Sequence, residues 1–143
     1  MKKIGFLTII LLLVPITFGC GSGKVQLSGT VTYSDTGEPL EAGTVAFQTE
    51  KFFARGTLGT DGKYVVSSIS ANDGMLPGKY KVYISGAHRQ IGETAEGTPI
   101  MEPLIEAKYE LPETSGMTLE VDKNTKTFDI QVDRCLNPKP FKH

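Results

Sequence analysis

The chain has 143 residues and a formal net charge of −1; 39% of its residues are hydrophobic and 22% are charged. This length fits one domain that can bury its own core. The near-neutral charge argues against nucleic-acid binding, which depends on neutralising phosphates. Two cysteines and two histidines cannot complete a four-ligand zinc site or a four-cysteine iron–sulfur cluster. We therefore expect no nucleic-acid partner, no metal centre and no cofactor.

Residues 1–19 have the pattern of an export signal. Lys2 and Lys3 form a short positive region, and uncharged residues 4–18, rich in Ile, Leu and Val, follow it. Pro15 interrupts this apolar run near its end. A membrane-spanning helix needs about twenty apolar residues, so the run is too short for one. We predict that residues 1–19 are a signal peptide that is removed from the mature protein.

The residues around Cys20 predict a lipid anchor. The segment 17–20, Thr-Phe-Gly-Cys, resembles the lipobox of bacterial lipoproteins, in which the cysteine is acylated and becomes the mature N-terminus. Gly19 fits that pattern, whereas Thr17 stands where Leu is usual and Phe18 where small residues dominate. The resemblance implies lipidation of Cys20, with residues 20–24 forming the attachment site and a flexible tether.

Cys20 has an alternative fate. An ordinary signal peptidase could cut after Gly19, and Cys20 could then form a disulfide with Cys135, the only other cysteine. Without residues 1–19 the chain has a net charge of −3, which gives no overall attraction to anionic lipid. The expected membrane contact is therefore the acylated Cys20 alone, with the protein facing the periplasm or the exterior.

Alternation of apolar and polar residues predicts short strands and no amphipathic helix in the mature chain. Turn sequences at 60–63 and 122–126 are each predicted to close a hairpin between neighbouring strands. Residues 87–116, with Pro, Gly and few strand formers, are expected to form a long loop, and residues 134–143 a flexible tail. The expected strands are 25–33, 43–49, 53–60, 64–70, 79–85, 117–121 and 127–132.

This spacing favours an all-β fold, a β-sandwich of about seven antiparallel strands over residues 25–133. The expected topology is prealbumin-like, of the immunoglobulin-like or transthyretin-like type. The absence of Trp and of two suitably spaced internal cysteines argues against an antibody-type domain.

Several motifs resemble those of carboxypeptidase-regulatory-like domains. They are the strand 25–32, the Gly-Glu-Pro-Leu segment that opens residues 37–47, the Asp-Gly-Lys-Tyr turn at 61–64 and the Leu-Pro-Gly-Lys-Tyr strand entry at 76–82. The segments 108–109, 114–118 and 127–130 resemble the end of the short lipoproteins of this type in planctomycete-like bacteria. The resemblance implies a prealbumin-like sandwich at the cell surface or in the periplasm. It implies no activity, because such sandwiches are general scaffolds.

The candidate catalytic and metal-binding residues are few. Ser85, His88 and Glu93 supply the side chains of a hydrolytic triad, but nothing in the sequence brings them together. Four aspartates fall in turns, where hydrogen bonding to the backbone explains them better than calcium binding does. These are Asp35, Asp61, Asp73 and Asp122.

Three functions remain open. We favour a non-enzymatic cell-envelope lipoprotein that acts as a structural or interaction module, with an envelope protein or a glycan as partner. The alternative is a carbohydrate- or peptide-binding accessory domain, for which Tyr80 and Tyr83 are candidate exposed aromatics, although core packing is the better expectation. A small hydrolase is the second alternative. An isopeptide link from Lys24 or Lys79 to Asn124 is also conceivable, but solvent-exposed lysines without a crosslink are the better expectation.

Overall fold

The computed structural model describes residues 23–143. The predicted signal peptide and Cys20 lie outside the described residues. Within residues 23–143, no helix is both long enough and apolar enough to cross a membrane.

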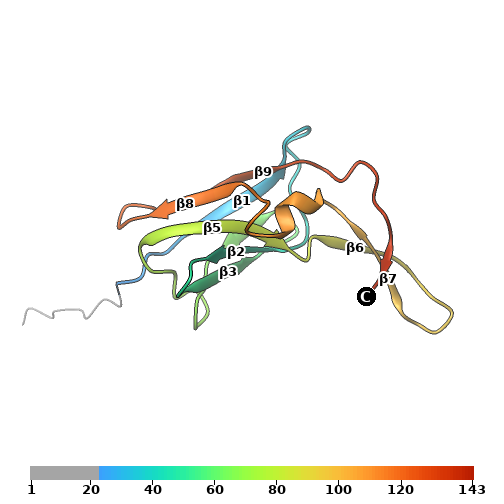
Figure 1. Ribbon diagram of the computed structural model, residues 1–143, viewed down its shortest axis with the longest axis horizontal. Helices are drawn as coiled ribbons and strands as arrows, with labels where there is room; N and C mark the ends of the chain where they lie inside the picture. The colour runs from blue at the N-terminus through green and yellow to red at the C-terminus, as the bar shows by residue number, and fades with distance from the viewer. Residues whose placement is uncertain (1–22) are drawn as a thin grey trace, which may run out of the picture.

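Seven strands form a sandwich of two sheets, which confirms the predicted all-β fold (Figure 1). One sheet has the order β4-β1-β9 and the other β3-β2-β5-β8. All pairs in these sheets are antiparallel except β1 and β9, which run parallel. The strands are β1 (Ser28–Tyr33), β2 (Thr44–Gln48), β3 (Phe53–Thr57), β4 (Lys63–Val65), β5 (Gly78–Ser85), β8 (Met117–Val121) and β9 (Ile130–Val132).

The core lies between the two sheets and is built by residues that alternate along the strands. In β5, Tyr80, Val82 and Ile84 are buried, whereas Lys79 and Lys81 are exposed. This period of two arises because successive side chains of a strand point to opposite faces. The largest side chains with essentially no exposed surface include Tyr80, Phe47, Leu27, Leu40, Met75 and Ile84.

Gly29 allows β1 to approach the chain before β9. A Cβ atom at this position would lie 2.0 Å from the Phe128 carbonyl oxygen and 2.8 Å from the Tyr64 hydroxyl oxygen. The Tyr64 hydroxyl donates a hydrogen bond to the same Phe128 carbonyl at 2.5 Å. The parallel pairing of β1 and β9 therefore depends on a residue without a side chain.

The two predicted hairpins have different outcomes. The turn at 60–63 forms, with the Gly59 N–H bonded to the Lys63 carbonyl oxygen at 2.9 Å and Gly62 at φ +73°. It closes a short hairpin in which Arg55 and Ser67 exchange backbone hydrogen bonds at 2.9 and 2.8 Å, while β4 itself pairs with β1. By contrast, β8 pairs with β5 and β9 with β1, so the turn at 122–126 crosses from one sheet to the other.

The segment 87–116, expected to be a long loop, contains regular structure. It holds β6 (His88–Glu93), β7 (Pro99–Pro103) and the short 3-10 helix η1 (Ala107–Glu110). Strands β6 and β7 form an antiparallel hairpin, with a register shift between Gln90 and Gly92. Two of the three prolines that suggested a loop, Pro99 and Pro103, stand at the two ends of β7, where they do not break the ladder.

The C-terminal segment also differs from the expected flexible tail. Strand β10 (Phe141–Lys142) pairs with β7, with Phe141 opposite Met101 and Lys142 opposite Ile100. The C-terminus therefore completes a third sheet, of order β10-β7-β6.

Candidate functional site

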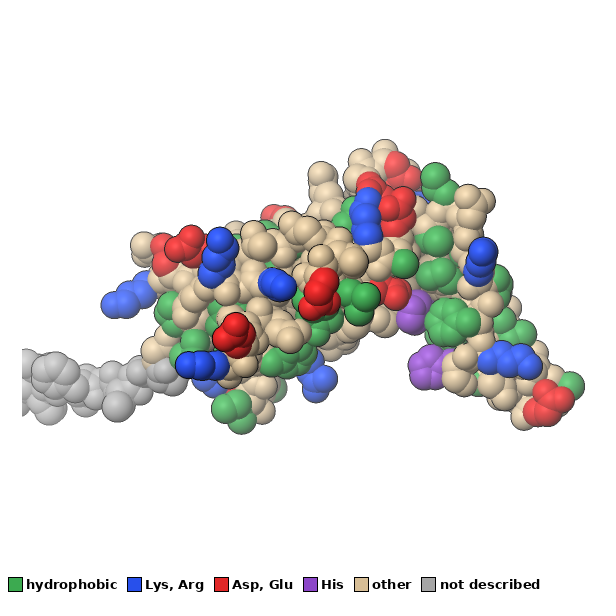
Figure 2. All heavy atoms as spheres, in the orientation of Figure 1, with side chains coloured by type: hydrophobic (Ala, Val, Ile, Leu, Met, Phe, Trp, Pro, Cys, Tyr) green, Lys and Arg blue, Asp and Glu red, His purple; other side chains and the backbone are tan. Residues whose placement is uncertain are grey.

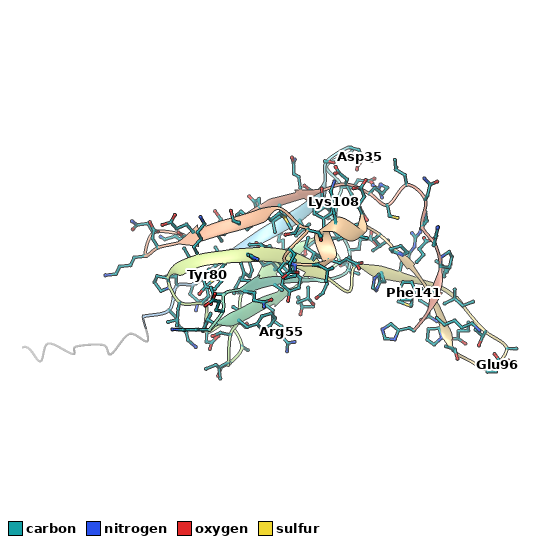
Figure 3. All side chains as sticks on the ribbon, in the orientation of Figure 1. Asp35, Arg55, Tyr80, Glu96, Lys108 and Phe141 are labelled. Atoms are coloured by element: carbon teal, nitrogen blue, oxygen red, sulfur yellow. The ribbon has the colours of Figure 1, made fainter. Side chains whose placement is uncertain are left out.

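The third sheet projects from one end of the sandwich, and we call it the arm (Figure 1). The described chain starts at the opposite end of the molecule from the arm. Glu96, at the tip of the arm, and Phe141 are labelled in Figure 3. A projecting, polar-tipped hairpin on a rigid scaffold is a common arrangement for a recognition element.

The arm has no core of its own. None of the residues of the hydrophobic core comes from positions 88–103 or from positions after Val132. The rings of His88 and Phe141 meet edge to face, with centroids 4.9 Å apart. In Figure 2 the histidine side chains lie beside hydrophobic ones on the inner side of the angle between arm and sandwich. A small sheet with both faces open gains most of its stability from what it packs against.

A cleft of about 510 Å³ lies where the arm joins the sandwich, and we call it the arm cleft. It is assembled from the end of β1, the segments 38–42 and 134–138, Thr60 and the first residues of the arm. Its charged and polar lining residues include Tyr33, Glu38, His88, Arg89, Glu102 and Arg134.

Arg134 organises the side of the cleft nearest β1. Its guanidinium carbon lies 3.7 Å from the centre of the Tyr33 ring, a cation–π contact. Its Nη2 atom donates to the Glu38 carboxylate at 3.0 Å, and its Nε atom lies 3.6 Å from the Asp35 carboxylate. Burial raises the pKa of Tyr33, and Arg134 partly opposes this shift. Tyr33 therefore stays a neutral hydroxyl at physiological pH.

Arg89 and His88 form the side of the cleft that belongs to the arm. Arg89 donates to the carboxylate of Glu102, its neighbour across the β6–β7 pair, and this hydrogen bond raises the pKa of the guanidinium. His88 Nε2 lies 3.2 Å from a carboxylate oxygen of Glu110 in η1. Arg89 and His88 thus each already have a carboxylate partner.

Asp133 fixes the base of the arm to the sandwich. Its carboxylate accepts hydrogen bonds from Lys108 at 2.7 Å, Ser34 at 2.7 Å and Tyr109 at 2.8 Å. Lys108 and these hydroxyl groups hold the pKa of Asp133 well below its ordinary value. Lys108 and Asp35, labelled in Figure 3, lie close to where the arm leaves the sandwich. The network joins β1, η1 and the chain after β9.

The residues of the possible triad are not brought together. His88 is hydrogen-bonded to Glu110 rather than to Glu93, and Glu93 accepts a hydrogen bond from Gln90. Within residues 23–143, no hydrogen bond links Ser85 to His88. The chain between His88 and Glu93 is extended strand, which separates the two side chains by roughly 16 Å.

Three of the four turn aspartates have the backbone role expected of them, and Asp35 does not. Asp61 and Asp122 each accept a backbone N–H two residues ahead, and Asp73 accepts three from residues 68–70. Asp35 faces Arg134. In the described part of the chain, no three His, Cys, Asp or Glu side chains are grouped so as to hold a metal ion.

The structure also places the tyrosines considered for ligand binding, the lysines considered for a crosslink and Cys135. Tyr80 is buried and donates to the Leu76 carbonyl at 2.8 Å, whereas Tyr83 is half-buried. Lys24 pairs with Asp73 at 2.5 Å rather than with Asn124, and Lys79 is exposed. Cys135 is half-buried in the arm cleft, and its predicted partner Cys20 lies outside the described residues.

Sequence reasoning missed the arm cleft almost entirely. Its lining comes from segments separated by up to a hundred positions, and no short motif marks Tyr33, Arg89 or Arg134. The Pro- and Gly-containing segment 87–116 was the one available signal, because long connections between strands are often functional.

No protein-family profile and no curated protein matches this sequence. Among solved structures, the chain is similar to the major pilin subunit BcpA of Bacillus cereus, with 12% identity and a TM-score of 0.46 over 78% of this chain and 30% of that one. It is also similar to a 9R-lipoxygenase from Cyanothece PCC8801, with 12% identity and a TM-score of 0.38 over 88% of this chain and 18% of that one. The chain thus spans less than a third of either structure's length, and neither likeness indicates a function.

Proposed function

We propose that this protein is an exported, lipid-anchored module of the cell envelope that acts by interaction rather than by catalysis. Its mature form begins at an acylated Cys20, and the arm with its cleft meets an envelope partner. The motifs that resemble carboxypeptidase-regulatory-like domains favour the same role, because those sandwiches serve as scaffolds.

The observation that carries this proposal is the opposite placement of the chain start and the arm (Figure 1). Gly23 is three residues from Cys20, and an extended chain of that length spans about 10 Å. An anchor at Cys20 therefore holds that end of the sandwich near the bilayer and directs the arm away from it.

The side chains of the cleft favour recognition over reaction. Arg134, Arg89 and His88 are each engaged by a carboxylate, and within residues 23–143 no serine, threonine or cysteine side chain is hydrogen-bonded to a histidine. Every buried side-chain nitrogen or oxygen atom within residues 23–143 has a hydrogen-bond partner. This site consists of paired charged side chains around one aromatic ring. It is suited to a polar peptide segment, whose own charged groups can replace one member of such a pair.

The test begins with the N-terminal peptide of protein that is expressed with its own signal and recovered from membranes. Its intact mass should show an acylated Cys20 as the first residue. The variant Cys20→Ala should be uncleaved or released, while Cys135→Ala, the matched control, should stay in the membrane fraction. An unmodified Cys20 in wild-type protein would refute the proposal.

The role of the arm is tested separately by crosslinking in intact cells. A photoreactive residue at Glu96 should capture envelope partners, while one at Lys51, at the other end of the sandwich, should not capture the same ones. Equal capture at both positions would remove the arm from the proposed function.

A further inference from the structure

The end of the sandwich at which the described chain begins is richer in lysine than the rest of the molecule. We call it the proximal end and define it as residues 23–28, 48–53, 68–81 and 120–126. It has six lysines and four carboxylates, whereas the rest of the described chain has seven basic and twelve acidic residues. The net charge of −3 of the mature chain therefore conceals a separation of charge along the molecule.

The structure shows that these four segments lie together. Val25 pairs with Met75, and the Ser28 N–H bonds to the Lys126 carbonyl oxygen at 3.1 Å. Gln48 stands opposite Lys81 in the β2–β5 pair. Tyr80, labelled in Figure 3, lies at this end, and in Figure 2 Lys and Arg side chains lie there among acidic ones, beside the start of the described chain.

Most of these lysines are available to a partner. Lys24 is half-buried and pairs with Asp73. The other five are exposed, and no ion pair within residues 23–143 involves them. They are Lys51, Lys79, Lys81, Lys123 and Lys126. Of the carboxylates in these segments, Asp73 is taken up by Lys24 and Asp122 by the turn that follows it, which leaves Glu50 and Glu120. Glu113, from outside the four segments, lines the same hollow as Lys51, Lys79 and Lys81.

A hydrophobic side chain protrudes among the lysines. Ile69 is 86% exposed, the largest exposure of any large hydrophobic residue described. Its loop is held by Asp73, which accepts hydrogen bonds from the backbone N–H groups of Ser68, Ile69 and Ser70 at 2.6, 3.1 and 3.0 Å. Leu76, 39% exposed, lies in the same end. The Ile69 side chain is thus carried on a turn whose backbone is held in place by hydrogen bonds.

We propose that the proximal end docks onto a membrane surface that contains anionic phospholipid, with its free lysines on the phosphate groups and Ile69 at the acyl boundary. The inference rests on the proposed lipid anchor, since an acyl chain at Cys20 confines this end within about 14 Å of the bilayer, the reach of the four residues to Lys24. Lysines beside an exposed apolar side chain match a lipid headgroup region in both charge and polarity. Docking would hold the arm pointing outward instead of letting the sandwich swing on its tether.

The experiment uses the lipidated protein in vesicles of phosphatidylcholine alone, or with about a third of phosphatidylglycerol. Lysines are acetylated briefly and quantified by mass spectrometry. Docking predicts that the five free lysines react at least about fivefold more slowly on the anionic vesicles. This factor corresponds to the attraction of about 1 kcal/mol between one lysine and an anionic leaflet. High salt should remove this protection. Lys139 and Lys142, near the arm, are internal controls and should react equally on both.

Matched variants separate the two parts of the surface. Lys79→Gln/Lys81→Gln should abolish the protection of Lys123 and Lys51, whereas Lys139→Gln/Lys142→Gln, with the same change in charge, should leave it intact. Ile69→Ser should weaken protection more than Leu136→Ser, which removes a side chain that is 79% exposed outside the proximal end.

The failures are distinguishable. Protein that floats with both kinds of vesicle but shows equal lysine reactivity on them would overturn docking and leave the anchor standing. Protein that floats with neither would overturn the proposed anchor, and docking with it.

Discussion

At the scale of single residues, Gly29 is the position where the fold tolerates least. Gly29→Ala places a Cβ against the backbone oxygen of Phe128, which cannot rotate away, so β1 and the chain before β9 must separate. We expect a loss of about 1–3 kcal/mol in the free energy of unfolding, the usual cost of overpacking. Urea unfolding measures this loss. Gly92→Ala, where a Cβ meets no atom within 4 Å, is the control and should change stability by less than about 0.5 kcal/mol.

Asp73 makes stability depend on acid. Lys24 and the backbone N–H groups of the turn, beginning with Ser68, hold the pKa of Asp73 far below its ordinary value of 3.8. A carboxylate whose pKa is lowered by folding stabilises the folded state above its ordinary pKa, and this contribution is lost as the pH falls further. Wild-type melting temperature should therefore drop as the pH falls from about 5 towards 2.

Asp73→Asn should lower the melting temperature at neutral pH and make its decline in acid shallower, so that the two curves converge. Glu96→Gln removes a carboxylate at the tip of the arm and serves as the control. A variant curve that stays parallel to that of wild type throughout would show that Asp73 is not the group responsible.

At the scale of elements, the arm should unfold independently of the sandwich. Phe141→Ala removes the ring that contacts His88 and weakens β10 on β7, while the core contains no residue from these strands. We expect faster amide hydrogen exchange in peptides that cover 88–103 and unchanged exchange in 44–57. Lys142→Ala, on the same strand, should have little effect. A matching acceleration in both regions would mean that arm and sandwich form one cooperative unit.

The strands that the sequence predicts well are those with one buried face. Residues 117–121 match β8, and 79–85 differ from β5 by one residue, because alternation there reflects burial against the core. Strands β6 and β7 have no buried residue, so they carry no such signal. The pairing of strands could not be predicted from these patterns either. A turn sequence shows where the chain reverses, but not whether the next strand joins the same sheet.

The arm cleft illustrates the same limit for a site. Tyr33 lies in a strand that was predicted, yet its partner Arg134 falls in a segment expected to be a tail. A cation–π contact across a hundred positions depends on the parallel placement of β1 beside β9, which local patterns do not encode. By contrast, Asp61 and Asp122 were interpreted correctly, because their backbone partners lie two residues ahead.

At the scale of the whole molecule, the length of the sandwich lies between Lys24 and Cys135. The chain from Lys24 to Tyr33 runs along the sandwich and spans roughly 30 Å if extended, and Cys135 lines the arm cleft together with Tyr33. The four residues from Cys20 to Lys24 reach about 14 Å at most, and a disulfide needs Cα atoms within about 7 Å of each other. We therefore predict that no intramolecular bond between Cys20 and Cys135 forms while Lys24 is paired with Asp73.

This geometry predicts that Cys135 stays a thiol in the mature protein. Denatured protein that has never met a reductant should titrate with one thiol per chain, and its electrophoretic mobility should not change on reduction. Cys135→Ser should abolish the titration. A peptide in which Cys20 is linked to Cys135 would contradict both the lipid anchor and the paired position of Lys24. The proposed anchor would occupy the sulfur of Cys20, so one remaining thiol is also the count that an acylated N-terminus requires.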